Sequence, residues 1–230
     1  MKEIMENGGV LALGKRYIFN NLWGADTGAG SQSVWGLERP DSQVSWGTRW
    51  DWRGREDTIK SYAAIVTGWH WGWRIAGTGL PLRVNAIRHA RTSWEFDLLQ
   101  DSAGGVNVTY DMWLSDNPRI QNENPSGEIM IWLNYSGVIQ PIGARKADFA
   151  IGGTSWILWE GPHPISGWPV YSFVRGESAD RVSLDLADFF AALASLGLDG
   201  IEYLISVQAG IEVFTGKGRL ETKSYSIDIE

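Results

Sequence analysis

The chain has 230 residues, a formal net charge of −7 and 43% hydrophobic residues, a composition typical of a globular protein with a sizeable core. The acidic balance, without any Lys/Arg cluster, argues against a nucleic-acid partner. The absence of cysteine excludes disulfides and thiolate metal sites, and no apolar run reaches the roughly 18 residues of a membrane span. The first ten residues lack the apolar stretch of a signal peptide, so the chain is either intracellular or has lost a targeting segment.

In chain order, short segments rich in Val, Ile, Tyr, Trp and Thr recur between turn signals such as NGG, GAG, DSAGG, NPS and GKG. They are residues 16–24, 42–52, 59–74, 92–99, 106–114, 128–135, 154–161, 170–176, 202–214 and 220–230. The chain also carries 28 glycines and 14 tryptophans. Many short strands with glycine-containing turns predict an all-β sandwich or barrel.

Residues 184–196, LDLADFFAALASL, differ from the rest because their apolar residues recur at a helical spacing. This pattern predicts one amphipathic helix of about three turns, beginning after Ser183, ending before Gly197 and packed on the outside of a sheet. The chain has no long linker, low-complexity segment or fixed repeat, so we expect a single domain over residues 1–230.

Side chains alternate across a strand, so residue parity predicts which of them share a face. Three segments each have one apolar face that is suited to a core. These faces are Ile129, Ile131 and Leu133; Val108, Tyr110 and Met112; and Ile205, Val207, Ala209, Ile211 and Val213. The opposite faces hold Glu128, Met130 and Trp132; Asn107, Thr109, Asp111 and Trp113; and Gln208, Gly210, Glu212 and Phe214.

Those opposite faces combine carboxylates with aromatic and amide side chains, where a solvated face would favour Lys, Glu and Thr. Aromatic rings stack on the flat apolar faces of pyranose rings, and amides and acids bond their hydroxyls. A single glutamate on a strand is usually just solvent exposed. Three carboxylates beside aromatics, each opposite a core face, favour a sugar-binding cleft.

Hydrolysis of a glycosidic bond usually needs two carboxyl groups that flank it. In a retaining enzyme one attacks the anomeric carbon while the other protonates the leaving oxygen and then activates water. One must be ionised and the other neutral, so their surroundings must separate the two pKa values. Glu128 and Glu212 are the candidates, and Asp111 is a third acid that could orient the nucleophile.

Six motifs in order make the chain resemble glycoside hydrolase family twelve, from Tyr17 to Ile229. They are YIFNNLWGAD, IKSY, VNVTYDMWL, GEIMIWL, the PIG of Pro141–Gly143 and VQAGIEVFTGKG. The resemblance implies a β-jelly roll sandwich of two curved antiparallel sheets with one α-helix and an open substrate cleft. It also implies retaining, endo-acting hydrolysis of β-1,4-glucan without a metal or cofactor.

Carried over by motif, Glu128 is expected to be the nucleophile, Glu212 the general acid/base and Asp111 the partner of the nucleophile. The resemblance also implies substrate-binding roles. Asn21 and Trp23 would bind sugar on the non-reducing side, Met130 and Phe214 would line the floor, and Pro141 belongs to the loop that the family calls the cord. Strand parity adds Asn107, Trp132 and Gln208 as expected substrate-binding residues, although several members of the family carry another residue in place of Gln208.

Several alternatives stay open at this point. The chain could prefer xyloglucan to cellulose-type glucan, and the segments 25–40 and 161–169 are expected to shape that preference. It could instead be a non-catalytic carbohydrate-binding sandwich. An inverting mechanism would place the two glutamates roughly 6.5–9.5 Å apart, and we expect the about 5–5.5 Å of a retaining enzyme. Because polymeric glucan cannot enter cells, we expect a secreted enzyme, acting as a monomer without nucleic-acid or membrane partners.

The tryptophans and histidines outside the motifs have open roles. Trp69, Trp71 and Trp73 share parity and either extend the cleft wall or pack beneath the helix. Among Trp46, Trp50 and Trp52, the last two are expected at the cleft rim, whereas Trp94, Trp156 and Trp159 are expected inside. His70, His89 and His163 lack metal-ligand spacing and are expected to be structural or exposed.

Overall fold

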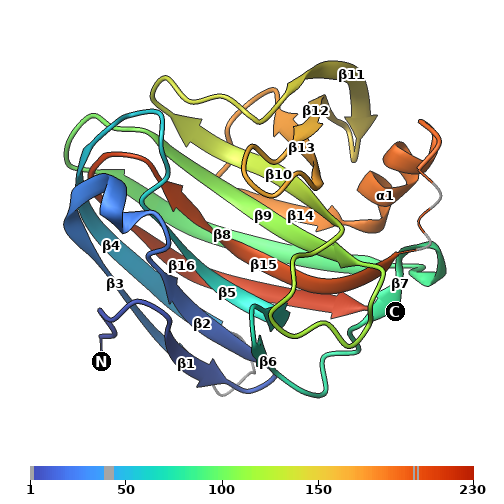
Figure 1. Cartoon of the computed structure of the whole chain (residues 1–230), viewed down its shortest axis with the longest axis horizontal. Helices are drawn as coiled ribbons and strands as arrows, with labels where there is room; N and C mark the ends of the chain where they lie inside the picture. Colours follow the sequence, from blue (N-terminus) through green and yellow to red (C-terminus); the bar gives the residue numbers. More distant parts are fainter. Residues whose placement is uncertain (1–2, 39–43, 199, 201) are drawn as a thin grey trace.

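In the computed structural model, residues 3–38, 44–198, 200 and 202–230 are described, and they form two sheets packed face to face (Figure 1). The larger sheet has the order β1 (Gly9–Leu13), β2 (Arg16–Asn21), β5 (Ser61–His70), β15 (Tyr203–Val213), β9 (Val106–Ser115), β10 (Gly127–Ser136), β13 (Pro169–Arg175), β12 (Thr154–Pro162) and β11 (Ala144–Ile151). Short strands β6 (Trp73–Arg74) and β7 (Leu82–Arg83) pair with β5 and β15. The smaller sheet has the order β14 (Arg181–Asp185), β8 (Ala90–Gln100), β16 (Gly216–Ile229), β4 (Val44–Gly54) and β3 (Gly28–Glu38).

All ten segments that the sequence marks as β-type contain a strand, and the predicted all-β sandwich is confirmed. The paired strands are antiparallel, except that β10 and β13 run parallel. Segment 25–40, which is expected to shape substrate preference, forms a short 3₁₀ turn η1 (Ala25–Thr27) followed by strand β3. Residues 39 and 40 lie outside the described part. A second 3₁₀ turn, η2 (Val84–Ala86), follows β7.

The core lies between the sheets and is built from the predicted apolar faces of β9, β10 and β15. The smaller sheet contributes Trp46, Trp50 and Trp52, each at most 3% exposed, so the expectation that Trp50 and Trp52 form a cleft rim is wrong. These indoles alternate with exposed residues such as Arg49, because β4 has one face on the core and one on solvent. Trp94 of β8 stacks on Trp46, as expected of an interior residue.

Two expected core residues lie on the cleft side instead. The ladder between β15 and β9 shifts register between Leu204 and Ser206, so Leu204 takes the core position and Ile205 faces the cleft. Trp159 is half-buried on the cleft side, opposite the core residues Trp156 and Leu158 of the same strand. The register shift therefore explains the position of Ile205. Trp159 lies on the cleft side because it is an odd number of residues from Trp156 along the same strand.

Helix α1 (Ala187–Ala194) is shorter than predicted because residues 184 and 185 still belong to strand β14. Ser183 lies in that strand, where it is paired with Ser93 of β8, and it does not cap the helix. Asp185 takes this place, since its Oδ1 accepts hydrogen bonds from the backbone N–H of Ala187 and of Ala90. Phe189 packs its ring against Trp156 and Phe173, so the helix covers the core side of the larger sheet. Within the described residues, no helix is long and apolar enough to cross a membrane.

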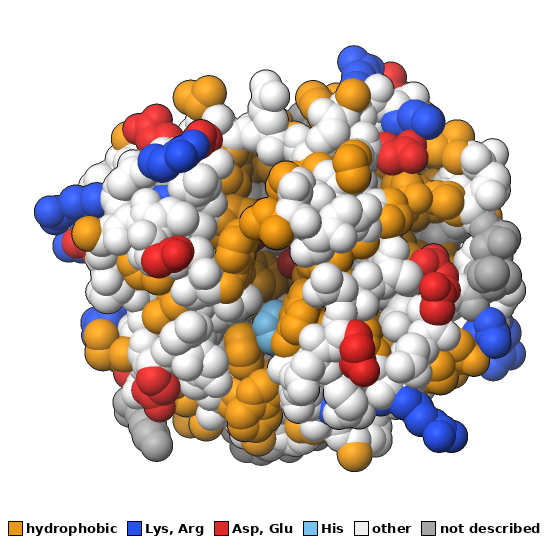
Figure 2. Space-filling model, in the orientation of Figure 1, with side chains coloured by type: hydrophobic (Ala, Val, Ile, Leu, Met, Phe, Trp, Pro, Cys, Tyr) orange, Lys and Arg blue, Asp and Glu red, His pale blue; other side chains and the backbone are white. Residues whose placement is uncertain are grey.

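The other face of the larger sheet is hollowed into a cleft that crosses the molecule (Figure 2). Hydrophobic side chains line the hollow, and an acidic group and a histidine are visible at its base. Two clusters of buried apolar residues cover this face: Tyr17, Phe19, Tyr62, Ala64 and Val66 at the β2–β5 side, and a second that includes Trp69, Trp113, Met130, Trp132, Ile139, Trp168 and Phe214. The cleft therefore has an apolar floor on both sides of its centre.

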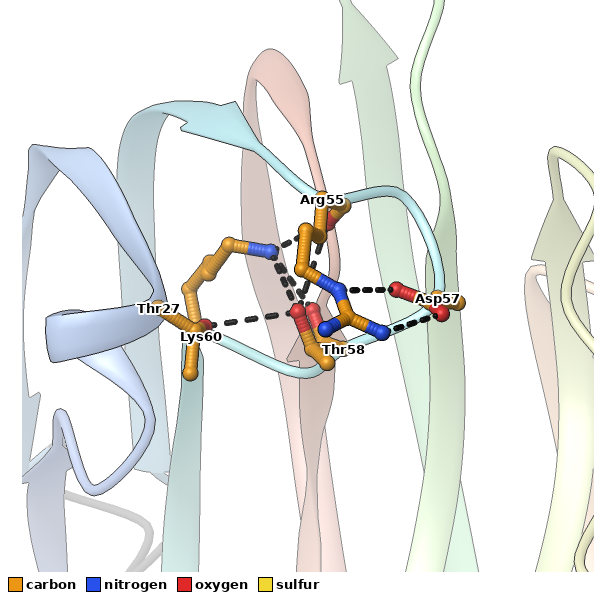
Figure 3. Close-up of polar contacts among 5 residues, drawn as sticks. All are labelled: Thr27, Arg55, Asp57, Thr58 and Lys60. Atoms are coloured by element: carbon orange, nitrogen blue, oxygen red, sulfur yellow. Dashed lines mark hydrogen bonds and ion pairs between the residues drawn. The ribbon is translucent and has the colours of Figure 1, made fainter.

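A fully buried lysine fixes the backbone next to this floor. Lys60 Nζ donates hydrogen bonds to the carbonyl oxygens of Arg55 and Thr58 (2.7 Å) and to the Thr58 hydroxyl (3.1 Å) (Figure 3). It also donates to the Phe214 carbonyl oxygen at 2.9 Å. Arg55 in turn forms a two-armed ion pair with Asp57, which shapes the same loop. The ammonium group thus joins the 55–58 loop to the end of β15, where Phe214 lies.

We expect Lys60→Met to destabilise the protein by about 1–3 kcal/mol, because it leaves buried carbonyl oxygens without a donor. At this chain length the loss corresponds to a decrease in Tm of about 2–4 °C per kcal/mol. Thermal unfolding of Lys146→Met is the control, since Lys146 forms only an exposed ion pair with Glu160 and its removal should be nearly neutral. Equal Tm values for the two variants would contradict this assignment.

Candidate active site

Three carboxyl groups from three neighbouring strands meet at the floor of the cleft. Asp111 lies on the central strand β9, Glu128 on β10 and Glu212 on β15. They are buried, with exposed fractions of 4%, 6% and 9%. Burial of three acids together is costly, so their presence on one concave face indicates a functional site.

The strand register places the two glutamates on opposite sides of the floor. Glu128 is paired with Trp113 near one end of β9, whereas Glu212 is paired with Asn107 near the other end. Asp111 lies between these positions and is paired with Met130 on one side and Gln208 on the other. The curved sheet brings the glutamates close enough for the Glu212 charge to raise the pKa of Glu128.

Each glutamate accepts one hydrogen bond from a neutral donor. Trp168 Nε1 donates to Glu128 Oε2 at 3.1 Å, and Asn107 Nδ2 donates to Glu212 Oε2 at 2.8 Å. Both bonds favour the ionised carboxylate and lower its pKa. Asn107 is therefore a direct partner of Glu212, in addition to facing the cleft as expected.

Burial is the dominant electrostatic influence and raises the pKa of Glu128, Glu212 and Asp111 well above the usual carboxyl range. The two glutamate charges raise the pKa of Asp111 further, while the approach of the Tyr62 hydroxyl lowers it by a smaller amount. Like charges at this spacing oppose full ionisation, so the cluster retains protons at pH values where isolated carboxyls have lost theirs.

Tyr62 is a site residue that the sequence did not single out. It pairs with Glu212 across β5 and β15, and its ring lies over Gly210. A Cβ at Gly210 would lie 2.8 Å from the Tyr62 ring and 2.4 Å from the Ala63 carbonyl oxygen, so glycine is required there for the close approach. The residue was not predicted because nothing in IKSY alone indicates which strand it will adjoin.

The remaining predicted substrate residues differ in burial. Met130, Trp132 and Phe214 are buried in the floor, whereas Trp23 is 53% exposed and presents its indole to solvent. Asn21 and Pro141 are half-buried; Asn21 Oδ1 accepts the Trp23 backbone N–H at 3.2 Å.

Gln208 is fully buried beside Asp111, and its side-chain amide nitrogen forms hydrogen bonds within the protein. Its Nε2 lies 3.1 Å from His70 Nδ1 and from Ser206 Oγ. Burial lowers the pKa of His70 to about 4, so this histidine is neutral at ordinary pH and accepts the amide hydrogen. Among the described residues, no group of three His, Asp or Glu side chains lies close enough together to hold a metal ion.

Four tryptophans form an aromatic wall beside Glu128: Trp69, Trp71, Trp113 and Trp168. The open question about Trp69 and Trp71 is thereby settled in favour of the cleft side, and Trp73 is exposed. Trp71 has a φ of +27°, which is unusual for a bulky residue. Its ring centroid lies 5.0 Å from that of Trp113. Trp168 comes from the 161–169 segment, where no strand alternation exists to predict its direction.

We expect Glu128→Gln to stabilise the folded chain at pH 7 but not at pH 4. The raised pKa means that the folded state holds a proton that the unfolded state loses above its ordinary pKa of 4.5, so wild-type stability falls as pH rises from there to the raised value. A neutral amide avoids this loss of stability, which is worth about 1–3 kcal/mol and therefore about 2–12 °C in Tm. Tm measured against pH tests it, with exposed Glu221→Gln as the control; a gain that is independent of pH would contradict it.

Comparisons with known proteins agree with this geometry. The model of glycosyl hydrolase family 12 matches residues 15–230. The chain is 34% identical over 224 residues to xyloglucan-specific endo-beta-1,4-glucanase A of Emericella nidulans, covering 94% of this chain and 86% of the relative. It superposes on the family 12 xyloglucanase of Bacillus licheniformis with a TM-score of 0.89 at 29% identity, covering all of both chains. It also superposes on the Humicola grisea Cel12A catalytic domain, solved with a thio cellotetraose, with a TM-score of 0.88 at 29% identity, covering 100% and 99% of the chains. The chain therefore belongs to glycosyl hydrolase family 12 and is a glycoside hydrolase, as its motifs predicted.

Proposed function

We propose that this chain is an endo-acting, retaining β-1,4-glucanase whose nucleophile is Glu128 and whose general acid/base is Glu212. The observation that carries the proposal is the approach of these two buried carboxyl groups from opposite sides of one cleft floor. A sugar linkage lying along that floor would have one carboxyl on each side, as double displacement needs. A non-catalytic binding module has no use for two such buried acids.

In the first step, Glu128 attacks the anomeric carbon while Glu212 gives its proton to the leaving oxygen. Burial raises the pKa of both glutamates, of Glu128 to about 8 and of Glu212 to about 7, and the Trp168 hydrogen bond opposes the rise at Glu128. The proposed roles require that, with substrate bound, the charge lies on Glu128 and the proton on Glu212. Because Asn107 donates to Glu212 Oε2, the acidic proton belongs on Oε1, which is left to face the substrate.

In the second step, a water attacks the anomeric carbon and gives a proton to Glu212 while the bond to Glu128 breaks and releases its carboxylate. Burial raises the pKa of Glu212, and esterification removes the negative charge of Glu128 that would oppose its ionisation, so the pKa of Glu212 falls in the intermediate. The same residue can then act as a base. Asp111 shares the buried volume and, with its raised pKa, can keep a proton while Glu128 is charged.

Substrate binding is proposed to follow the length of the cleft. Exposed Trp23 would stack on a sugar ring on the non-reducing side, next to Asn21, and Met130, Trp132, Phe214 and Pro141 would line the other side. A groove that is open on its solvent side admits a polymer in its middle, which suits endo-acting cleavage (Figure 2). The proposed enzyme works as a single, exported domain and monomer, without cofactor or metal.

A xyloglucan-specific enzyme is the second candidate, favoured by the named activity of the Emericella nidulans and Bacillus licheniformis relatives. Xyloglucan carries xylose branches, so its cleft must leave room beside the main chain. The wall of Trp69, Trp71, Trp113 and Trp168 places packed indole rings beside Glu128, which supports an unbranched substrate at that point.

We expect both Glu128→Gln and Glu212→Gln to lose at least about 10³-fold in kcat on soluble β-1,4-glucan, since each removes a group required in the chemical step. Reducing-sugar release measures the loss, and proton NMR of the first product should show retained β configuration. Half-buried Glu160→Gln, which only removes the ion pair to Lys146, is the matched control and should keep full activity. Equal release by all three variants would exclude the catalytic assignment, and an inverted first product would exclude double displacement.

We expect a higher kcat/KM on unbranched β-1,4-glucan than on xyloglucan, because the aromatic wall leaves little room for branches beside Glu128. Initial rates on the two polymers, at equal concentrations of backbone glucose, make the comparison. Faster hydrolysis of xyloglucan would instead select the second candidate.

A further inference from the structure

Trp168 belongs to a short loop, residues 163–168, that leads from β12 into β13 and folds back on itself. The His163 N–H donates to the Trp168 carbonyl oxygen at 2.7 Å, and the Gly167 N–H donates to the His163 carbonyl oxygen at 2.9 Å. Gly167 has a φ of +79°, a conformation in which glycine carries no Cβ penalty. The loop ends are thus fixed to each other by their own backbone.

The His163 ring holds the indole of Trp168 in place. The two rings are stacked, with centroids 4.4 Å apart and planes inclined by 25°. His163 Nδ1 accepts the backbone N–H groups of Ser166 at 3.1 Å and Ile165 at 3.4 Å, so this nitrogen carries no proton and the ring cannot turn freely. Burial also lowers the pKa of His163, which agrees with a neutral ring.

The rest of the aromatic wall confines the indole on its other sides. Trp113 meets Trp168 edge to face at 5.7 Å and 86°, and Trp71 approaches to 6.4 Å. Trp168 is only 8% exposed in this packing. Its Nε1–H points at Glu128 Oε2, and within the described part of the chain it is the one side-chain donor that the structure gives to Glu128.

We propose that Trp168 is a positioning residue that orients Glu128 and favours its carboxylate form, and that His163 in turn positions Trp168. The inference rests on the proposed role of Glu128 as nucleophile. It goes beyond that role because it assigns the control of the nucleophile to a loop outside the catalytic strands.

The hydrogen bond also selects the attacking atom. Because Glu128 Oε2 accepts the indole N–H, Oε1 is the atom that forms the bond to the anomeric carbon. At the same time the bond from that carbon to the leaving oxygen breaks, and the leaving oxygen takes the proton of Glu212. Oε2 then becomes the ester carbonyl and keeps the indole hydrogen bond. A hydrogen bond to an ionised oxygen is stronger than one to a neutral oxygen, so its largest effect is on the free carboxylate.

The first test is Trp168→Phe, which keeps an aromatic ring but removes the donor. We expect the acidic limb of kcat/KM against pH to move upward by about one pH unit. The titration of Glu128, followed by carbon NMR of δ-labelled glutamate, should move in the same direction. The other titratable groups facing Glu128 are Asp111 from β9, Glu212 from β15 and Tyr62 from β5, and all are unchanged in the variant.

The exposed Trp73→Phe is the matched control and should leave both curves in place. Unchanged curves for Trp168→Phe would overturn the inference. If neither wild type nor variant releases sugar but the Glu128 titration still moves, the control of Glu128 by Trp168 stands and the proposed function fails.

The second test separates the two contacts of His163 and does not depend on a buried substitution. His163→Phe keeps the stacked ring and loses the acceptor, whereas His163→Asn keeps an acceptor for the loop N–H groups and loses the ring. Each His163 variant should move the kcat/KM curve and the Glu128 titration by part of the shift that Trp168→Phe gives. Combined with Trp168→Phe, neither His163 variant should cause any further shift. Full additivity, or no shift in either single variant, would overturn the positioning role.

Discussion

The pairing of β9 with β10 on one side and β15 on the other forces three carboxyl groups into one buried volume. Their mutual repulsion and burial oppose ionisation, so the site exists only because the surrounding strands are strong enough to hold it. The core faces of the same strands supply that strength, since Ile129, Ile131, Val108 and Ile211 are at most 1% exposed. The buried apolar face of each strand therefore offsets the destabilisation caused by the buried carboxyl group on its opposite face.

The high tryptophan content divides into two physical roles. Trp46, Trp50, Trp52 and Trp94 fill the space between the sheets, where a large apolar surface contributes most to stability. Trp69, Trp71, Trp113 and Trp168 instead exclude water from one flank of the carboxyl cluster, which strengthens every charge interaction there. Lys60 and Gly210 complete the support by fixing the backbone on either side of Glu212.

Strand parity alone predicted the faces of β9, β10 and most of β15, because alternation holds wherever the register is unbroken. It failed at Ile205, where a bulge that local sequence does not encode reverses the face. The roles of Trp50 and Trp52 could not be predicted, since alternation gives two faces but not which one meets the second sheet. Tyr62 and Trp168 were missed because a strand neighbour and a loop direction are both set by tertiary contacts.

Parallel pairing of β10 with β13 sets Val170 beside Glu128, so the turn entering β13 arrives at the same end of the sheet as this proposed nucleophile. An antiparallel partner would have delivered that turn to the opposite rim. Surface turns accept substitutions and length changes far more readily than paired strands do. Substitutions within residues 163–168 would therefore change the surroundings of Glu128 while the pairing of β9, β10 and β15 stays as it is.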